Sequence, residues 1–221
     1  MIEITIKSKI MKKTLLLGML LVTTLAAQAV IYSTNWNSGF VNGTLIPDNN
    51  YSGWTDSRTL SGVSGTIQDI SVTLDLANGW NGDLYAYLVF GDGFSVLLDR
   101  VGHPASSVGY GDTGFDVTLR LTGNPIESYQ SYPSTFSETG QLEGNWAAHS
   151  GLGSFVGLDP NGTWNLFIAD LSGGGVTTVQ SWGLQMDIVA VPEVESWIAA
   201  ALAGAFGAFW LNRQLWGTKK A

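Results

Sequence analysis

Two alternating segments joined by a glycine-rich turn, within residues 158–188, constrain the fold of this chain more than any other stretch. Large apolar residues occupy every second position of both segments: Trp164, Leu166 and Ile168 in the first, and Trp182, Leu184, Met186 and Ile188 in the second. A period of two is the pattern of a β-strand with one buried face. The stretch therefore predicts two tryptophan-anchored strands of a β-sandwich.

The preceding part of the chain predicts further strands of the same kind. Alternation is clean over residues 70–76, and strands are also expected over 84–90, 94–98 and 115–121. Tyr85, Tyr87 and Val89 interleave with apolar neighbours, so strand 84–90 is expected to be buried on both faces. Residues 51–54 suggest a turn, 30–43 a lead-in segment, and 122–157 a long connection. We expect an all-β, jelly-roll-like β-sandwich of about seven or eight strands.

The same segments resemble the P domain, also called P/Homo B, which accompanies subtilisin-like proprotein convertases and many secreted bacterial proteins. Matching stretches are residues 46–49, 67–76, 81–84, 160–164 and 181–184, and the resemblance covers about residues 44–189. The motif positions are Asp83, Asn161, Gly162, Trp164, Asp170 and Trp182. The sequence departs from the family at residues 77–80, where a His-Thr or His-Ser pair is common. The resemblance implies a jelly-roll sandwich without peptidase activity of its own.

Charge is distributed unevenly along the chain. Between Val30 and Ala190 there are fifteen acidic residues and three basic ones, Arg58, Arg100 and Arg120. Such a surface repels phosphate backbones, so we expect no nucleic acid partner. The acidic excess suits either calcium or a cationic partner, or else it keeps a secreted domain soluble. The chain contains no cysteine and hence no disulfide.

Residues 1–29 have the pattern of a secretory signal peptide. Several lysines precede the apolar run 15–25, and Ala27 and Ala29 are small residues of the kind that mark a cleavage site. Cleavage after Ala29 would make Val30 the first mature residue. Translation starting at Met11 would leave an equally good leader. The alternative is an uncleaved anchor helix, for which the apolar run is short.

Residues 190–221 have the pattern of a sorting and anchoring tail. Val191, Pro192 and Glu193 precede an apolar segment, residues 197–211, and Arg213 and two lysines follow it. This resembles the PEP-CTERM tail of Gram-negative bacteria, which implies an exosortase-type processing enzyme as a partner; Val194 stands where that family usually has proline. The segment predicts a short transmembrane helix with its basic end in the cytoplasm and the sandwich outside. We expect an exported protein, membrane-anchored or released to the cell surface after processing.

The sequence offers little that could carry catalysis. Its two histidines, His103 and His149, lie in glycine- and serine-rich loops without a nucleophile motif. Asp159 and Asp170 could act as paired carboxylates of a glycosidase, although nothing in the sequence places them at a working separation. We therefore expect no enzyme and no catalytic residue.

Calcium is the one candidate ligand for the acidic turns. Five aspartates lie in or beside turns within 34 residues and could supply oxygen ligands. They are Asp83, Asp92, Asp99, Asp112 and Asp116. The alternative is that they simply cap turns.

Three functions fit these features. The first is a non-catalytic, surface-displayed module that binds extracellular polysaccharide or a protein, with exposed aromatics such as Trp54, Trp80 or Trp146 in contact with the ligand. The second is a P domain that assists a separate subtilisin-like peptidase in trans. The third, an enzyme acting on carbohydrate, is the weakest, because fold alone implies no activity.

Overall fold

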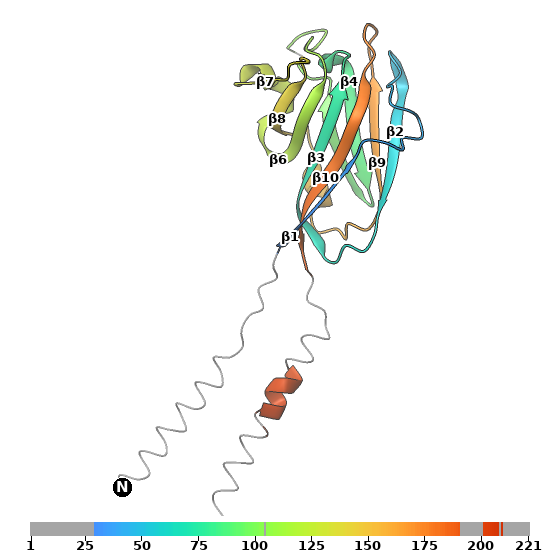
Figure 1. Ribbon diagram of the computed structural model, residues 1–221. Coiled ribbons are helices and arrows are strands. Elements are labelled where there is room, and N and C mark those ends of the chain that lie inside the picture. Colours follow the sequence, from blue (N-terminus) through green and yellow to red (C-terminus); the bar gives the residue numbers. More distant parts are fainter. Residues whose placement is uncertain (1–28, 104, 191–200, 208, 210–221) are drawn as a thin grey trace, which may run out of the picture.

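Two β-sheets packed face to face form the described chain between residues 29 and 190, which confirms the predicted β-sandwich (Figure 1). The structure is a computed structural model that describes residues 29–103, 105–190, 201–207 and 209. The sandwich residues alternate in burial along their strands, because successive side chains point to opposite sides of a sheet.

The larger sheet has six strands in the order β1-β10-β3-β6-β8-β7. These are β1 (Ala29–Trp36), β10 (Thr178–Val189), β3 (Thr66–Ala77), β6 (Phe115–Pro125), β8 (Leu142–Ala147) and β7 (Thr135–Phe136). All neighbours are antiparallel except β6 and β8. Ala29 pairs with Val189, so both ends of the described sandwich lie side by side at one end of it. We call this end the base and the opposite end the distal end.

The smaller sheet has four antiparallel strands in the order β2-β9-β4-β5. They are β2 (Asn50–Leu60), β9 (Gly162–Asp170), β4 (Leu84–Phe90) and β5 (Gly93–Asp99). Three short 3-10 helices interrupt the connections: η1 (Asn81–Asp83), η2 (Ile126–Ser131) and η3 (Leu152–Phe155).

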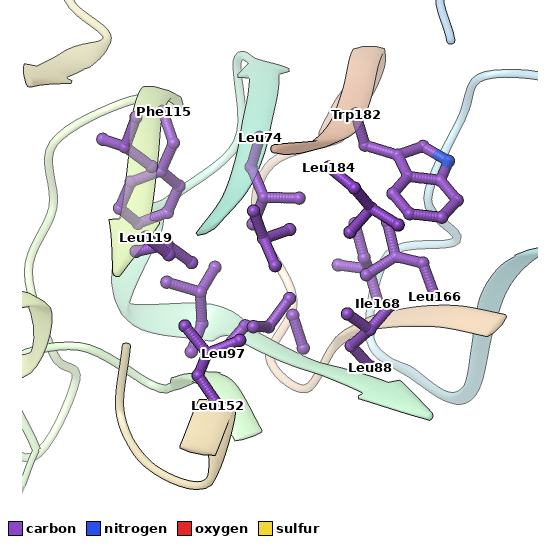
Figure 2. Close-up of a cluster of buried hydrophobic side chains, with 14 of the residues drawn as sticks. Leu74, Leu88, Leu97, Phe115, Leu119, Leu152, Leu166, Ile168, Trp182 and Leu184 are labelled. Carbon is purple, nitrogen blue, oxygen red and sulfur yellow. The ribbon is translucent and has the colours of Figure 1, made fainter. Parts of the chain in front are cut away.

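The core lies between the sheets, and the residues predicted to be buried form it. Figure 2 shows leucines of β3, β4, β5 and β10 meeting across this layer with Phe115 and Trp182. Burial of such side chains contributes about 1.5–3 kcal/mol each. The two stretches with the clearest alternation became the two strands β9 and β10, as predicted.

Three segments differ from the expectation. Residues 51–54, expected as a turn, begin strand β2, where the backbone bulges at Gly53 with a φ of 59°. A β-bulge absorbs turn-like residues without ending the strand. The expected connection 122–157 contains β7 and β8, and β1 adds part of the expected lead-in to the larger sheet.

Strand β4 is fully buried on one face only. Leu84, Ala86 and Leu88 lie in the core, whereas Tyr85 and Tyr87 are half-buried on the outer face of the small sheet. The expectation of burial on both faces was wrong, because no element among the described residues forms a layer over that side of the sheet. A period-two pattern that is apolar at every position does not indicate which face is covered.

Several predictions lie outside the described residues: signal peptide residues 1–28 with Ala27, and tail residues Val191, Pro192, Glu193 and Arg213. Ala29 and Val30 of the predicted cleavage site are the first residues of β1. Residues 201–207, within the predicted membrane segment 197–211, are helical. The described parts of the chain contain no helix that is both long and apolar enough to span a membrane.

Candidate functional site

The distal end concentrates the polar chemistry of the sandwich. Asp83 in η1 and Asp170 at the end of β9 are both buried there, and Asp170 is 0% exposed. Strand pairing brings them together, because Leu84, the residue after Asp83, pairs with Asp170. These two motif positions, far apart in sequence, therefore meet in space, near the turn that follows β9.

The environment of both carboxyl groups opposes their ionisation. Burial raises the pKa of Asp170, and the negative charges of Asp83 and Asp48 raise it further. Burial also raises the pKa of Asp83. The positive charge of Arg100, whose Nη2 lies 3.9 Å from Asp83 Oδ1, acts to lower that pKa. One oxygen of Asp170 accepts a hydrogen bond from the backbone N–H of Ser172 (3.1 Å), while its Oδ2 is buried without a partner. The cluster thus sets three carboxyl groups, those of Asp48, Asp83 and Asp170, against the side chains of Arg100 and His103.

A cavity of about 560 Å³ is lined in part by Arg100, the partner of Asp83, and collects both histidines of the chain. Its lining comprises Asp99, Arg100, His103, Glu127 and His149. The His149 ring lies between two carboxylates, with Nδ1 3.2 Å from Glu127 Oε1 and Nε2 3.8 Å from Asp99 Oδ2. Burial raises the pKa of Glu127, whereas the backbone N–H of Asp99 and the His149 ring act against this.

The cavity lacks the arrangement that nucleophilic catalysis requires. Within residues 29–103 and 105–190, no hydrogen bond joins either histidine ring to a serine or threonine hydroxyl, and His103 Nε2 is buried without a partner. Asp159 and Asp170, the carboxylate pair considered for a glycosidase, lie before and at the end of the nine-residue strand β9. At about 3.3 Å per residue the two ends of β9 are about 26 Å apart. Even if the three residues from Asp159 to Gly162 turned back along the strand by about 11 Å, the Cα atoms of Asp159 and Asp170 would stay about 15 Å apart. Glycosidases need a separation below about 10 Å, so this pair is excluded.

The five aspartates proposed as calcium ligands do not gather at one point. Asp83 faces Arg100, Asp99 faces His149, and Asp112 accepts hydrogen bonds from Tyr129 and Gln130. Asp92 lies in the β4–β5 turn and Asp116 on β6, both exposed. No group of three or more metal-ligating side chains occurs in the described part of the chain. Calcium binding stays a prediction.

The remaining motif positions hold the sandwich together. Trp164 stacks on Phe90 with ring centroids 4.0 Å apart, and the Trp182 indole donates a 2.7 Å hydrogen bond to the buried Asp56. Asn161 bonds both the N–H and the carbonyl of Val63, which ties the β2–β3 loop to β9. Gly162, with a φ of 136°, begins β9.

The outer face of the small sheet is an aromatic surface that sequence reasoning missed. Tyr87 stacks on Phe167 with centroids 4.6 Å apart, and Phe94 lies 5.4 Å from Tyr87. By contrast, Trp54 and Trp146, considered as exposed sugar-binding aromatics, are only 1% and 4% exposed and belong to the core. Trp80 is 46% exposed at the distal end. Only the strand register reveals that rings from β4, β5 and β9 share one face.

Comparison with known proteins gives no assignment of family. No family model and no curated protein matches the chain. Among solved structures, a chain of the complex between the Aeromonas sobria serine protease and the chaperone ORF2 is similar, with 16% identity and a TM-score of 0.47 over 74% of this chain and 27% of that one. The serine protease of Aeromonas sobria alone gives 16% identity and a TM-score of 0.46 over 72% of this chain and 27% of that one. This chain therefore spans about a quarter of the length of either structure.

Proposed function

We propose that this chain is a non-catalytic, P-domain-like module that is exported, held at the cell surface, and binds extracellular polysaccharide or a protein. The observation that carries the proposal is the pairing of Ala29 with Val189. The two ends of the described sandwich therefore lie together at its base. Attachment there is compatible with a partner that binds a sheet face or the distal end.

The chemistry of the distal end supports a binding role over a catalytic one. The histidine ring of His149 is held by Glu127 and Asp99 and has no nucleophile to activate among the described residues. A general base needs a proton donor within hydrogen-bonding reach. The apolar residues Leu202, Phe206 and Phe209, exposed in the described part of the tail, support attachment to a membrane.

Processing and location of the full chain in a Gram-negative host test this proposal. We expect a mature N-terminus at Val30 by mass spectrometry, and digestion of the sandwich when intact cells are treated with an external protease. Extracellular material should then be washed from the cells and analysed for bound polysaccharide or protein. An intact leader, or full protection from protease in intact cells, would refute export. Recovery of a subtilisin-like peptidase as the bound protein would favour assistance in trans.

A further inference from the structure

The outer face of the small sheet differs from the rest of the domain in its charge. Strand register aligns its residues in three rows: Thr59 with Thr163; Ser57 with Asn165, Val89 and Phe94; and Thr55 with Phe167, Tyr87 and Val96. None of these side chains is charged, although the domain carries fifteen acidic residues. Asp99 and Asp92 lie only at the two ends of β5.

One half of this face is aromatic. The rings of Tyr85, Phe94 and Phe167, from β4, β5 and β9, each pack against the central ring of Tyr87. Phe94 is the most open of them at 48% exposure. Exposed ring faces pack against apolar C–H groups, while ring edges carry partial positive charge and attract oxygen atoms.

The other half of the face carries hydroxyl and amide groups. The Ser57 hydroxyl donates to the side-chain oxygen Oδ1 of Asn165 at 2.7 Å, and the Thr59 and Thr163 hydroxyls are 3.0 Å apart. A hydroxyl has one donor and two acceptor positions, so each retains capacity for a ligand. Apolar rings beside uncharged donors and acceptors match a pyranose, which has C–H faces and equatorial hydroxyls.

We propose that this uncharged aromatic face, formed by β2, β9, β4 and β5, binds a neutral polysaccharide. The proposal rests on the proposed function and names its ligand class and its surface. Charge selects the ligand. An anionic polymer would be repelled by the acidic domain and find no cation on this face, because Arg58 is engaged by Asp56 at 2.6 Å. A cationic polymer would find its partners elsewhere, since the three rows contain no acid.

Binding of neutral glucans to the purified full chain tests the proposal, in a detergent without a sugar head group. Two variants are designed to keep the fold. Phe94→Ala removes the most open ring, and Asn165→Asp adds a charge to the middle of the face while keeping the oxygen that Ser57 bonds. Phe136→Ala is the matched control, because Phe136 is similarly exposed at 42% but lies on β7 of the other sheet. Thermal melts verify that each variant is folded.

We expect the wild-type chain to bind a neutral glucan in about 1 M salt as it does in dilute buffer, since no ion pair is involved. Phe94→Ala should weaken binding about two- to tenfold, the range of one aromatic contact, and Asn165→Asp should weaken it as well. Phe136→Ala should bind like wild type. Glucan binding that both face variants retain in full would overturn the assigned surface but leave the proposed function standing. Binding only to a charged polymer or to a protein would overturn the neutral ligand. Absence of any partner in the surface experiment would count against the proposed function itself.

Discussion

Asp170 provides a sharp test of the electrostatics at the distal end. It is fully buried, one oxygen accepts a hydrogen bond from Ser172, and the other has no partner. Asp170→Asn preserves the shape of the side chain and the oxygen that Ser172 bonds, but removes the charge. The substitution therefore measures what it costs this fold to bury that charge.

The expected gain follows from the cost of an unsatisfied buried group, about 1–3 kcal/mol and more when the group is charged. The amide of asparagine would still need a partner, so we expect the free energy of unfolding to rise by about 1–3 kcal/mol at neutral pH. At about 2–4 °C per kcal/mol for a domain of this size, Tm should rise by about 2–12 °C. Because folding raises the pKa of Asp170, its stabilising contribution is present in acid and lost as pH rises through the folded-state pKa. The advantage of asparagine should therefore shrink as the pH falls toward about 4.

The assay is a set of thermal melts of the full chain in detergent and chelator, at neutral and acidic pH. Asp92→Asn, at an exposed turn, is the control and should leave Tm unchanged. A Tm for Asp170→Asn at or below that of wild type, at neutral pH with chelator present, would refute the reasoning. The predicted calcium binding is tested in parallel melts without chelator: millimolar calcium should raise Tm, and no rise would contradict it.

Three further substitutions test the packing. Trp182→Phe should cost about 1–3 kcal/mol, because it removes the hydrogen bond to the buried carboxylate of Asp56; chemical denaturation measures the loss, and an unchanged midpoint would contradict it. Asn161→Ala should speed backbone hydrogen exchange around Val63 while the remaining core exchanges as before; uniform exchange across the domain would argue against a local tie. Gly79→Ala should destabilise by more than about 1 kcal/mol, because φ is 67° and an added Cβ would overlap a neighbouring hydroxyl; a wild-type Tm would speak against this strain.

The sequence was sufficient to predict the strands that have one apolar, buried face and one polar, exposed face. Trp164 and Trp182 stand in clean alternation, and both became buried anchors of the sandwich. Strand β8 was missed because residues 142–147 hold few apolar residues, and its partner β6 ends 17 residues earlier. A pairing across that distance leaves no local signal.

The candidate surfaces were less predictable because they depend on register. Tyr87 and Phe167 are eighty residues apart and become neighbours only when β4 pairs with β9. The same pairing sets Leu84 opposite Asp170 and so brings Asp83, the preceding residue, close to Asp170. Asp159 and Asp170 are close in sequence, but Asp159 lies before the start of β9 and Asp170 lies at its far end. An extended strand covers more distance per residue than any other regular structure. Two residues that are close in the sequence can therefore lie far apart in space when a strand separates them.

The position of β10 between β1 and β3 has a mechanical consequence. Tension applied to the chain after Val189 enters the domain along the axis of β10, which is bonded on both sides over most of its length. The inter-strand bonds of an antiparallel sheet run perpendicular to the strands, so such a load strains many of them together instead of one after another. A domain pulled from this end by flowing water would be loaded in shear, and many hydrogen bonds would have to break at once. Tension on β1 alone would act on an edge strand with a single neighbour.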